Sequence, residues 1–413
     1  MQNKTLRSVL IVFVAIVLVV SAFGGGFVVG NFVPALKPLF VSTLPATPAD
    51  NQGGTPADLQ SQFAPFWQAW DLVHQNFVDK SQIDDTKLMQ GAVRGMMDAL
   101  GDPHSGYWSP QETSDAAMSM QGEYDGIGAF VDTRGDYLTI SKPILGYPAE
   151  QVGLQIGDQI IAVDGQDVTG MDPDLVRMTK VMGPSGTDVH LTIHRSGVDQ
   201  PLEFTITRAH IVIPSVISKM LDKNIAYIQI TVFGDNTASD FHNQLLELMA
   251  QNPSGIVLDL RDNGGGYLNA GIAVASEFID HGIIVTEQYG DGTKIPHDSN
   301  TGGLALTLPL VVLVNGNTAS ASEIVSGTIQ DDGRGKLVGE LTYGKGSVQN
   351  WLPLSDGGTA RITIAKWLTP NGRTIDKLGL TPDLIVTMTQ DDFTAKRDPQ
   401  LDAAIQLLLN PQQ

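Results

Sequence analysis

Hydrophobic positions divide the chain into segments of different periodicity. After residue 58, apolar side chains recur at helical spacing as far as residue 100, and the first of them are Phe63, Phe66, Trp67, Trp70 and Val73. We expect these aromatic side chains to belong to the core. Between residues 115 and 208, short apolar runs alternate with Gly and Asp turns, which predicts a small β-rich region.

The segment from residue 209 to 413 contains three units in which an apolar run is followed by a loop and a helical pattern. The runs IAYIQI, GIVLDL and LVVLV precede helices expected at 237–250, 268–279 and 320–330. Further strands are expected at 360–368 and 383–388. Repeated β–loop–α units predict a mixed α/β core, here with an inserted β-rich domain.

The first 58 residues differ from the rest. Lys4 and Arg7 precede an uncharged run of 21 residues from Val9 to Val29. This length is enough to span a bilayer core of roughly 30 Å, and the positive flank predicts export of everything that follows. We therefore expect a cytoplasmic segment at 1–8, a transmembrane signal-anchor at 9–29 and a linker at 30–58. A signal peptide cleaved near residues 21–26 is the alternative, and both readings place the body of the protein outside the cytoplasm.

Composition narrows the classes of function. The chain carries 25 Lys and Arg against 45 Asp and Glu, a formal net charge of −20, and no cysteine. Nucleic-acid binding needs a basic surface, so that partner is not expected. Disulfides, thiolate chemistry and cysteine-based metal sites are excluded. We expect neither a cofactor nor a metal.

Candidate catalytic residues lie in two segments, NGNTASASEIVSGTIQD at 315–331 and GELTYGKGSVQ at 339–349. Ser320 stands where a buried strand turns into a helix. Ser320 and Glu323 also fit a capping box, which explains the same residues without catalysis. A helix N-terminus nevertheless suits a nucleophile, because the Ala321 amide would point at a developing oxyanion.

A nucleophilic serine needs a base. Lys345 lies between two glycines and before an apolar segment, a context that favours burial and a lowered pKa. The eight histidines lie outside any motif directed at a serine, and G-x-S-x-G is absent. A histidine base remains the alternative. Gln349 is placed to hold the amine only if the segment bends, because four residues of straight strand span roughly 13 Å.

Two other segments resemble known binding motifs, a phosphate loop and a glycine-rich loop. The stretch from Gly339 to Lys345 matches G-x-x-x-x-G-K, but Gly346 stands where a phosphate loop needs Ser or Thr, so an NTPase is excluded. In LDLRDNGGGYLNAG, the glycines at 264–266 allow close backbone approach and a second oxyanion donor. We expect Asp262 to pair with Arg261 or to cap the turn, and not to bind a metal.

The segment YDGIGAFV at 124–131 is a glycine-punctuated turn that leads into a strand, and its backbone amides suit an anion. With PAEQVGLQIGDQIIAVDGQDV at 148–168, it resembles a PDZ domain, a module that binds the C-terminus of a peptide as an added strand. The resemblance implies that the carboxylate is held by Gly126, Ile127, Gly128 and Ala129.

The motifs GDPHSGYW, LDLRDNGGG, TASASEI, QDDGRGKLVGE and TYGKGSVQ together resemble the carboxyl-terminal processing (tail-specific) proteases over about residues 65–390. The resemblance implies a helical part of the protease at 59–114, the PDZ domain at 115–208 and the serine protease core at 209–413. It also implies a role for each site residue. Ser320 is the nucleophile, Lys345 the general base and Gln349 its positioning residue, with the Ala321 and Gly265 amides as oxyanion donors.

Two departures from the family pattern are visible. Gly264 stands where proline is common before the glycine pair, and Met182 where some members carry an activating arginine. The expectation is a membrane-anchored, exported serine endopeptidase that binds protein or peptide substrates with exposed C-terminal tails, and that can form a homo-oligomer. The alternative is a non-catalytic PDZ scaffold on an inactive hydrolase fold.

Overall fold

The computed structural model describes residues 55–133, 135–389, 391–392, 395 and 397–410. The chain divides into a unit that ends at Ile83 and a unit from Asp84 onward, and each is described by itself. The apolar run at 9–29, expected to cross a membrane, lies outside the described residues. Within the described ranges, no helix has the length and apolar character needed for a membrane span.

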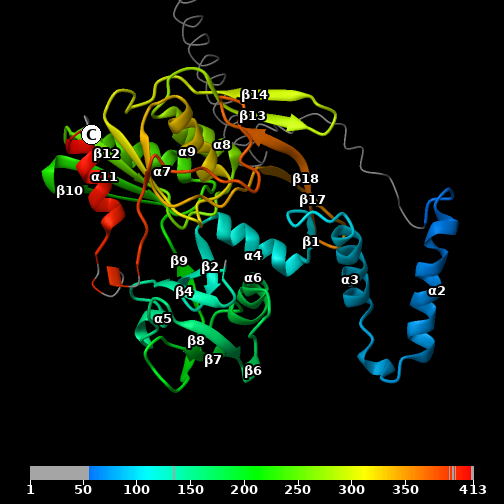
Figure 1. Ribbon diagram of the computed structural model, residues 1–413. Helices are drawn as coiled ribbons and strands as arrows, with labels where there is room; N and C mark the ends of the chain where they lie inside the picture. The colour runs from blue at the N-terminus through cyan, green and yellow to red at the C-terminus, as the bar shows by residue number, and fades with distance from the viewer. Residues whose placement is uncertain (1–54, 134, 390, 393–394, 396, 411–413) are drawn as a thin grey trace, which may run out of the picture. The chain divides into compact units, whose positions relative to one another are not determined.

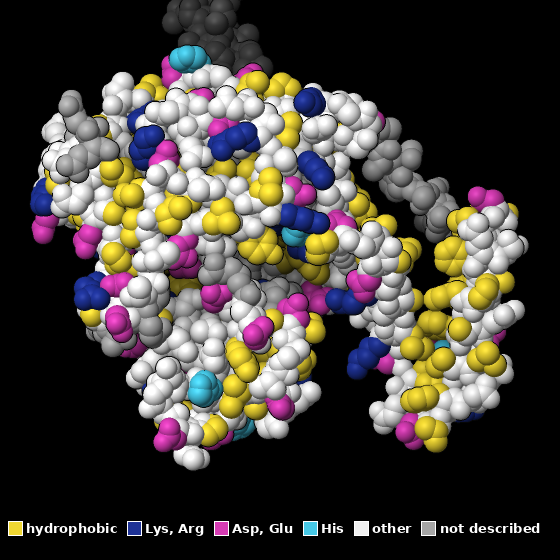
Figure 2. Space-filling view, in the orientation of Figure 1, with side chains coloured by type: hydrophobic (Ala, Val, Ile, Leu, Met, Phe, Trp, Pro, Cys, Tyr) yellow, Lys and Arg dark blue, Asp and Glu magenta, His cyan; other side chains and the backbone are white. Residues whose placement is uncertain are grey.

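The first unit contains the helix α2 (Gln60–Asn76) and the short 3₁₀ helix η1 (Lys80–Gln82). The prediction that its aromatic side chains are core residues is wrong, since α2 has no buried residue and Trp67 is 49% exposed. Phe66, Trp67 and Trp70 instead contact one another along the helix. Figure 2 shows hydrophobic side chains gathered along this helix.

The region expected to form the protease core is built on a six-stranded sheet in the order β10-β11-β12-β15-β16-β19 (Figure 1). The strands from β11 onward are parallel, and β10 is antiparallel to β11. Their bounds are β10 Val216–Leu221, β11 Ile225–Ile230, β12 Gly255–Asp259, β15 Leu310–Val314, β16 Lys336–Gly339 and β19 Leu384–Ile385. The strand expected at 383–388 is therefore only two residues long.

Both faces of this sheet are covered, which explains why its strands read as unbroken apolar runs. Ile256 and Leu258 face the cluster formed with α7 (Thr237–Met249), α8 (Leu268–Ser276) and α9 (Ala321–Asp331). Val257 faces the opposite cluster, formed with α11 (Pro399–Leu409). The three predicted β–loop–α units are confirmed.

A second, five-stranded sheet is antiparallel and centres on β18, which pairs with β17, β1 and β13, while β14 forms the outer edge. Two helices of the N-terminal part, α3 and α4, lie near β1. The bounds are β1 Gly106–Trp108, β13 Ile283–Tyr289, β14 Lys294–Asp298, β17 Ser347–Pro353, β18 Thr359–Leu368, α3 Asp85–Asp98 and α4 Pro110–Met120. This sheet brings residues 105–108 beside residues 359–363.

The inserted β-rich domain has an antiparallel sheet in the order β3-β4-β5-β7-β8, with β6 on β5, and a ribbon of β2 and β9 joins it to the core. It begins later than expected, because residues 115–120 still belong to α4 and the first strand starts at Glu123. The bounds are β2 Glu123–Gly126, β3 Ala129–Asp132, β4 Leu138–Pro143, α5 Pro148–Gln151, β5 Gln159–Val163, β6 Gln166–Asp167, α6 Pro173–Val176, the π-helix η2 Arg177–Val181, β7 Asp188–His194, β8 Leu202–Thr207 and β9 Ala209–Val212.

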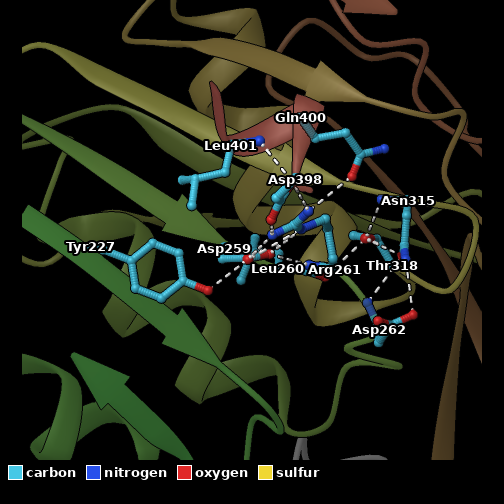
Figure 3. A network of polar contacts seen from close by, with 10 residues as sticks. All are labelled: Tyr227, Asp259, Leu260, Arg261, Asp262, Asn315, Thr318, Asp398, Gln400 and Leu401. Atoms are coloured by element: carbon cyan, nitrogen blue, oxygen red, sulfur yellow. Dashed lines mark hydrogen bonds and ion pairs between the residues drawn. The ribbon is translucent and has the colours of Figure 1, made fainter. Parts of the chain in front are cut away.

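An ion-pair network ties the end of β12 to the start of α11 (Figure 3). The Arg261 guanidinium donates to Asp259 at 2.6 Å and to both carboxylate oxygens of Asp398 at 2.9 Å. Tyr227 donates to Asp259 at 2.8 Å. Two carboxylates therefore hold Arg261, one at the end of β12 and one at the start of α11. Together they fix the first residues of the loop that follows β12.

We expect Asp398→Asn to lower the free energy of unfolding by about 1–3 kcal/mol, because Arg261 loses its charged partner on α11. Urea unfolding of the purified protein measures this change. Lys336→Met is the control, since it removes an ion pair whose lysine is 65% exposed, and its cost is expected to stay below about 1 kcal/mol. Equal losses in the two variants would contradict the buried role of Arg261.

Candidate active site

Ser320 occupies the turn between β15 and α9, as predicted, in an unusual backbone conformation. Its φ of 54° and ψ of −118° lie outside the extended region that an N-cap residue normally adopts. Such a conformation at a non-glycine residue costs about 1–3 kcal/mol, and it persists only where the surroundings impose it. Here Asn263 holds the turn, since its carbonyl accepts the Ala319 amide at 3.0 Å and the Ser322 hydroxyl at 2.9 Å. Ser322 is fully buried, which leaves Ser320 as the serine at the surface of the site.

Glu323 connects the serine turn to the lysine segment. The capping box predicted for Ser320 and Glu323 is present, and the Glu323 carboxylate accepts the Ser320 amide at 2.9 Å. The same carboxylate accepts the Thr342 hydroxyl at 2.6 Å and the amides of Gly344 and Lys345 at 2.7 and 2.9 Å. Burial raises the pKa of Glu323, while these four donors act in the opposite direction. The cap of α9 and the segment of the predicted base are therefore joined by one carboxylate.

Lys345 is held in a tight turn before β17. Burial, together with the positive charge of Arg361, lowers the pKa of the Lys345 ammonium from 10.5 to about 8. The flanking glycines are needed for close approach. A Cβ on Gly344 would lie 2.8 Å from the Gly379 amide, and one on Gly346 would lie 2.6 Å from the Asp376 amide. The Gly–Lys–Gly pattern thus reflects a turn packed against residues 375–379.

Gln349 lies in β17, where a bulge between Val348 and Gln349 interrupts the register with β18. Lys345 precedes the strand, so the spacing of a straight strand does not apply between them. The Gln349 side-chain nitrogen donates to Ser347 at 2.8 Å and to Thr363 at 3.2 Å. Its role beside the lysine stays a prediction.

The two predicted oxyanion donors differ in their surroundings. Ala321 is the first residue of α9, and its amide is among those that a helix leaves without an internal partner. Gly265 packs directly against it, since a Cβ there would lie 2.9 Å from the Ala321 nitrogen and 2.7 Å from Ser320 Cβ. The Gly265 amide, however, donates to Asn263 Oδ1 at 2.9 Å. Only after release of that bond would Gly265 serve as a second donor.

One cavity of about 900 Å³ contains the predicted nucleophile, base and positioning residue, and it extends to the β-rich domain. Its lining from that domain is Tyr124, Phe130, Arg177, Thr179 and Met182. The lining from the protease part includes Trp108, Gly264, Gly265, Gly266, Ile213, Leu268, Ser320, Ala321, Ile324, Lys345, Val348, Gln349, Trp351, Arg361 and Trp367. The lining is mainly apolar, and its polar side chains come from α4 and the β-rich domain as well as from the loops around Ser320 and Lys345.

The predicted carboxylate-binding turn lies between β2 and β3. Ile127 is buried, and its carbonyl accepts the Ala149 amide at 2.7 Å. Gly128 has a φ of 79°, and a Cβ there would lie 2.5 Å from Tyr147 Cβ. The neighbours Tyr124 and Phe130 line the cavity, whereas the four predicted residues, Gly126, Ile127, Gly128 and Ala129, are not among its lining.

Asp262 does not pair with Arg261 as expected, because Arg261 is engaged by Asp259 and Asp398 (Figure 3). Asp262 instead accepts the side-chain nitrogens of Asn315 and Asn317, at 2.8 and 3.0 Å. It thereby ties the loop after β12 to the loop after β15. No group of three or more metal-ligating side chains is present in the described ranges.

Two basic side chains near the lysine were not predicted from the sequence. Arg361 lies over the Trp108 ring at 4.7 Å and lowers the Lys345 pKa. Burial and then Lys345 lower the pKa of His104, which sequence reasoning had set aside with the other histidines. Neither residue stands in a motif with Ser320 or Lys345. The pairing of β17 with β18 places Arg361 near the lysine segment, and the pairing of β1 with β18 adds the turn that holds His104.

Comparisons with known proteins agree with this architecture. The Peptidase family S41 model matches residues 224–386, a PDZ domain model matches 139–195, and the model of the activating protease CtpB N-terminal domain matches 18–113. The carboxy-terminal-processing protease of Bartonella bacilliformis is 36% identical over 79% of this chain and 75% of its own. Carboxy-terminal processing protease CtpA of Bacillus subtilis is also 36% identical, over 78% of this chain and 69% of its own.

Among solved structures, a photosystem II D1 C-terminal processing protease matches with a TM-score of 0.59 and 29% identity, over 79% of this chain and 93% of that one. Mature CPAF matches with a TM-score of 0.53 and 13% identity, over 86% and 94%, and shares the fold. Fold and sequence thus define a serine-type peptidase with a PDZ domain. The chain belongs to the carboxy-terminal processing proteases of peptidase family S41, which confirms the resemblance seen in the sequence.

We expect Glu323→Gln to destabilise the protein by about 1–3 kcal/mol, because the amide nitrogen of glutamine would face buried donors in place of an acceptor. Chemical denaturation measures the change. The matched control is Glu247→Gln, an exposed glutamate on α7, where a change within about 0.5 kcal/mol is expected. A neutral result at Glu323 would contradict its role as the connection between the two segments.

Proposed function

We propose that this enzyme cleaves proteins near their C-terminal tails by a Ser–Lys mechanism. The observation that carries the proposal is the half-buried Lys345, with a pKa of about 8, in the same cavity as the strained Ser320. An amine with this pKa is partly neutral near pH 7.5 and can accept a proton, which an exposed lysine does poorly. The scaffold alternative offers no reason for such a lysine.

The reaction follows from the positions of these groups. Neutral Lys345 removes the proton of the Ser320 hydroxyl as its oxygen attacks the scissile carbonyl, and the Ala321 amide stabilises the oxyanion. The resulting ammonium gives that proton to the leaving amine, and the acyl-enzyme remains on Ser320. Water, deprotonated by Lys345, then releases the acyl group and restores the serine.

Substrate binding through the PDZ domain is supported by the continuity of the cavity, which is lined by Phe130 of β3 and by Arg177 and Thr179 of η2 as well as by Ser320. A tail bound beside β3 would lead into the cleavage site. We also propose that residues 9–29 anchor the enzyme in the cell membrane with the catalytic part outside the cytoplasm, on the basis of their uncharged sequence and positive flank.

The direct test is cleavage of a reporter protein that carries an apolar, unstructured tail. Ser320→Ala and Lys345→Ala are each expected to lower kcat/KM at least about 10³-fold, because each removes a group that acts in the chemical step. Lys219→Ala, an exposed lysine on β10, is the control and is expected to match the wild type.

A second arm uses tail peptides with a free or an amidated C-terminus, and amidation is expected to raise KM. If Ser320→Ala cleaves the reporter as fast as the wild type, Ser320 is not the nucleophile, and the non-catalytic PDZ scaffold becomes the better account of this chain. Equal KM values for the free and the amidated peptide would contradict the proposal that the enzyme recognises the terminal carboxylate.

The pH dependence of kcat/KM distinguishes lysine from histidine as the base. Because only the neutral amine accepts a proton, the rate is expected to rise with pH, with a midpoint near 8, and then to level off. Arg361→Gln removes a positive neighbour that lowers the Lys345 pKa, so the midpoint is expected to move upward. A midpoint at or below about 6.5 would assign the base to a histidine.

A further inference from the structure

The indole of Trp367, a fully buried residue of β18, donates a hydrogen bond to the backbone carbonyl of Lys345 at 2.9 Å. The backbone amide of the same tryptophan donates to the Gly346 carbonyl at 3.0 Å. One residue of the antiparallel sheet thus holds two successive carbonyl groups of the lysine turn. The direction of both bonds is unambiguous, because an indole or backbone N–H only donates and a carbonyl oxygen only accepts.

The backbone amide of Lys345 is held by a different element. It donates to the Glu323 carboxylate, on α9, at 2.9 Å. Both polar backbone groups of the proposed base therefore bind side chains from outside its own turn, a carboxylate at the start of α9 and an indole near the end of β18. The two peptide planes that meet at the Lys345 Cα are rigid. Holding one plane on each side fixes the direction in which the lysine side chain leaves the backbone.

The glycines on either side of Lys345 make these external bonds necessary. Glycine has more accessible backbone conformations than any other residue, and Gly344 adopts a φ of 87°. A Gly–Lys–Gly turn therefore has little conformational preference of its own. The lysine side chain adds a flexible four-carbon stem. Without fixed peptide planes, the amine would be spread over a volume much larger than the one that serves a proton transfer.

The ring of Trp367 lies between the hydrophobic core and the cavity. It belongs to the main core cluster, together with Ile324 and Ile375, and it also reaches the wall of the cavity that contains Ser320 and Lys345. Protein interiors are close-packed, so a ring in this position has little freedom to move. The indole N–H is therefore a donor held in place by the core.

We propose that Trp367 is a positioning residue for Lys345, and that its indole N–H holds the lysine carbonyl so that the amine stays in the cavity within reach of Ser320. The proposal rests on the Ser–Lys mechanism and adds to it a residue that acts through the lysine backbone and takes no part in proton transfer. Release of the carbonyl lets the turn move toward solvent. The chemical step then slows, while the binding of the substrate tail is unchanged.

Trp367→Phe tests the proposal, since phenylalanine keeps a flat apolar ring in the core and removes the N–H. We expect kcat to fall about 10- to 100-fold, the scale of a small misplacement of a catalytic group, with KM within about twofold of wild type. The midpoint of the pH profile is expected to move upward, because a lysine nearer to water keeps its proton to higher pH. Phe278→Leu is the control for lost packing, since Phe278 is fully buried in the same core cluster and lies outside the cavity lining. Its kcat and pH midpoint are expected to match the wild type.

A second variant removes the hydrogen bond with almost no change of shape. 3-Benzothienylalanine, introduced at position 367 by codon reassignment, has sulfur in place of the indole N–H and keeps both rings. We expect the same fall in kcat and the same upward shift of the pH midpoint as in Trp367→Phe. A wild-type kcat in this variant would overturn the proposal, because the ring and not the hydrogen bond would then support the lysine. This variant decides the question even if Trp367→Phe fails to fold.

A measurement that does not depend on activity separates this proposal from the mechanism on which it rests. Trace labelling with acetic anhydride at a series of pH values, followed by peptide mass spectrometry, gives the titration midpoint of the Lys345 amine in the Ser320→Ala protein. The midpoint is expected near 8 with tryptophan at position 367 and higher with benzothienylalanine. Lys219, an exposed lysine, is the control, and its labelling is expected to be the same in both proteins.

The two failures are distinguishable. An unchanged Lys345 midpoint in the benzothienylalanine protein would overturn the positioning role of Trp367 even if the enzyme is a Ser–Lys peptidase. A raised midpoint together with full cleavage of the reporter by Ser320→Ala would keep the hold of Trp367 on Lys345 and overturn the mechanism.

Discussion

The buried carboxylate of Glu323 is the constraint on which the site depends. It accepts backbone amides from the serine turn and from the lysine turn, and so adds to the bond from the Tyr343 amide to the Thr318 carbonyl, at 3.0 Å, that also links these two segments. A buried carboxylate without such donors is costly, so the two turns stabilise the charge and the charge holds the turns together. The position of Ser320, the proposed nucleophile, relative to Lys345, the proposed base, is in this way constrained by a third side chain.

The site is assembled where two sheets meet. The parallel sheet supplies the loops after β12 and β15, with Gly265 and Ser320, and the antiparallel sheet supplies β17 and β18, with Gln349 and Arg361. Each sheet also braces its own contribution. Asp262 joins the two loops of the parallel sheet, and the turn at residues 102–105, through the pairing of β1 with β18, supports the antiparallel one. Loops from one sheet and strands from the other therefore line the same cavity.

Much of this arrangement could be predicted from local sequence. The three β–loop–α units, the PDZ domain and the serine at a helix start follow from periodicity, turn residues and short motifs, which act over neighbouring residues. The surroundings of Ser320 and Lys345 were harder. Arg361 comes near the lysine through the pairing of β17 with β18, and His104 through the pairing of β1 with β18, whose residues lie more than 200 positions apart; one sequence carries no record of either pairing.

The incorrect predictions have physical causes of the same kind. The aromatic residues of α2 have a helical period typical of a core helix, yet periodicity does not say what covers the apolar face. Asp262 was expected to pair with Arg261 or to cap the turn, but the Arg261 guanidinium donates to Asp259 and Asp398. Asp398 lies 137 residues away in sequence.

The most direct test of the account identifies the residue that carries the acyl group. A p-nitrophenyl ester of a tail peptide acylates a serine peptidase faster than it is released, so an acid quench during the initial burst retains the adduct for peptide mapping by mass spectrometry. The account predicts the acyl group on Ser320 in the wild type and its absence in Lys345→Ala. An acyl group on Ser322, on a histidine, or on Ser320 in equal amount without Lys345 would contradict it.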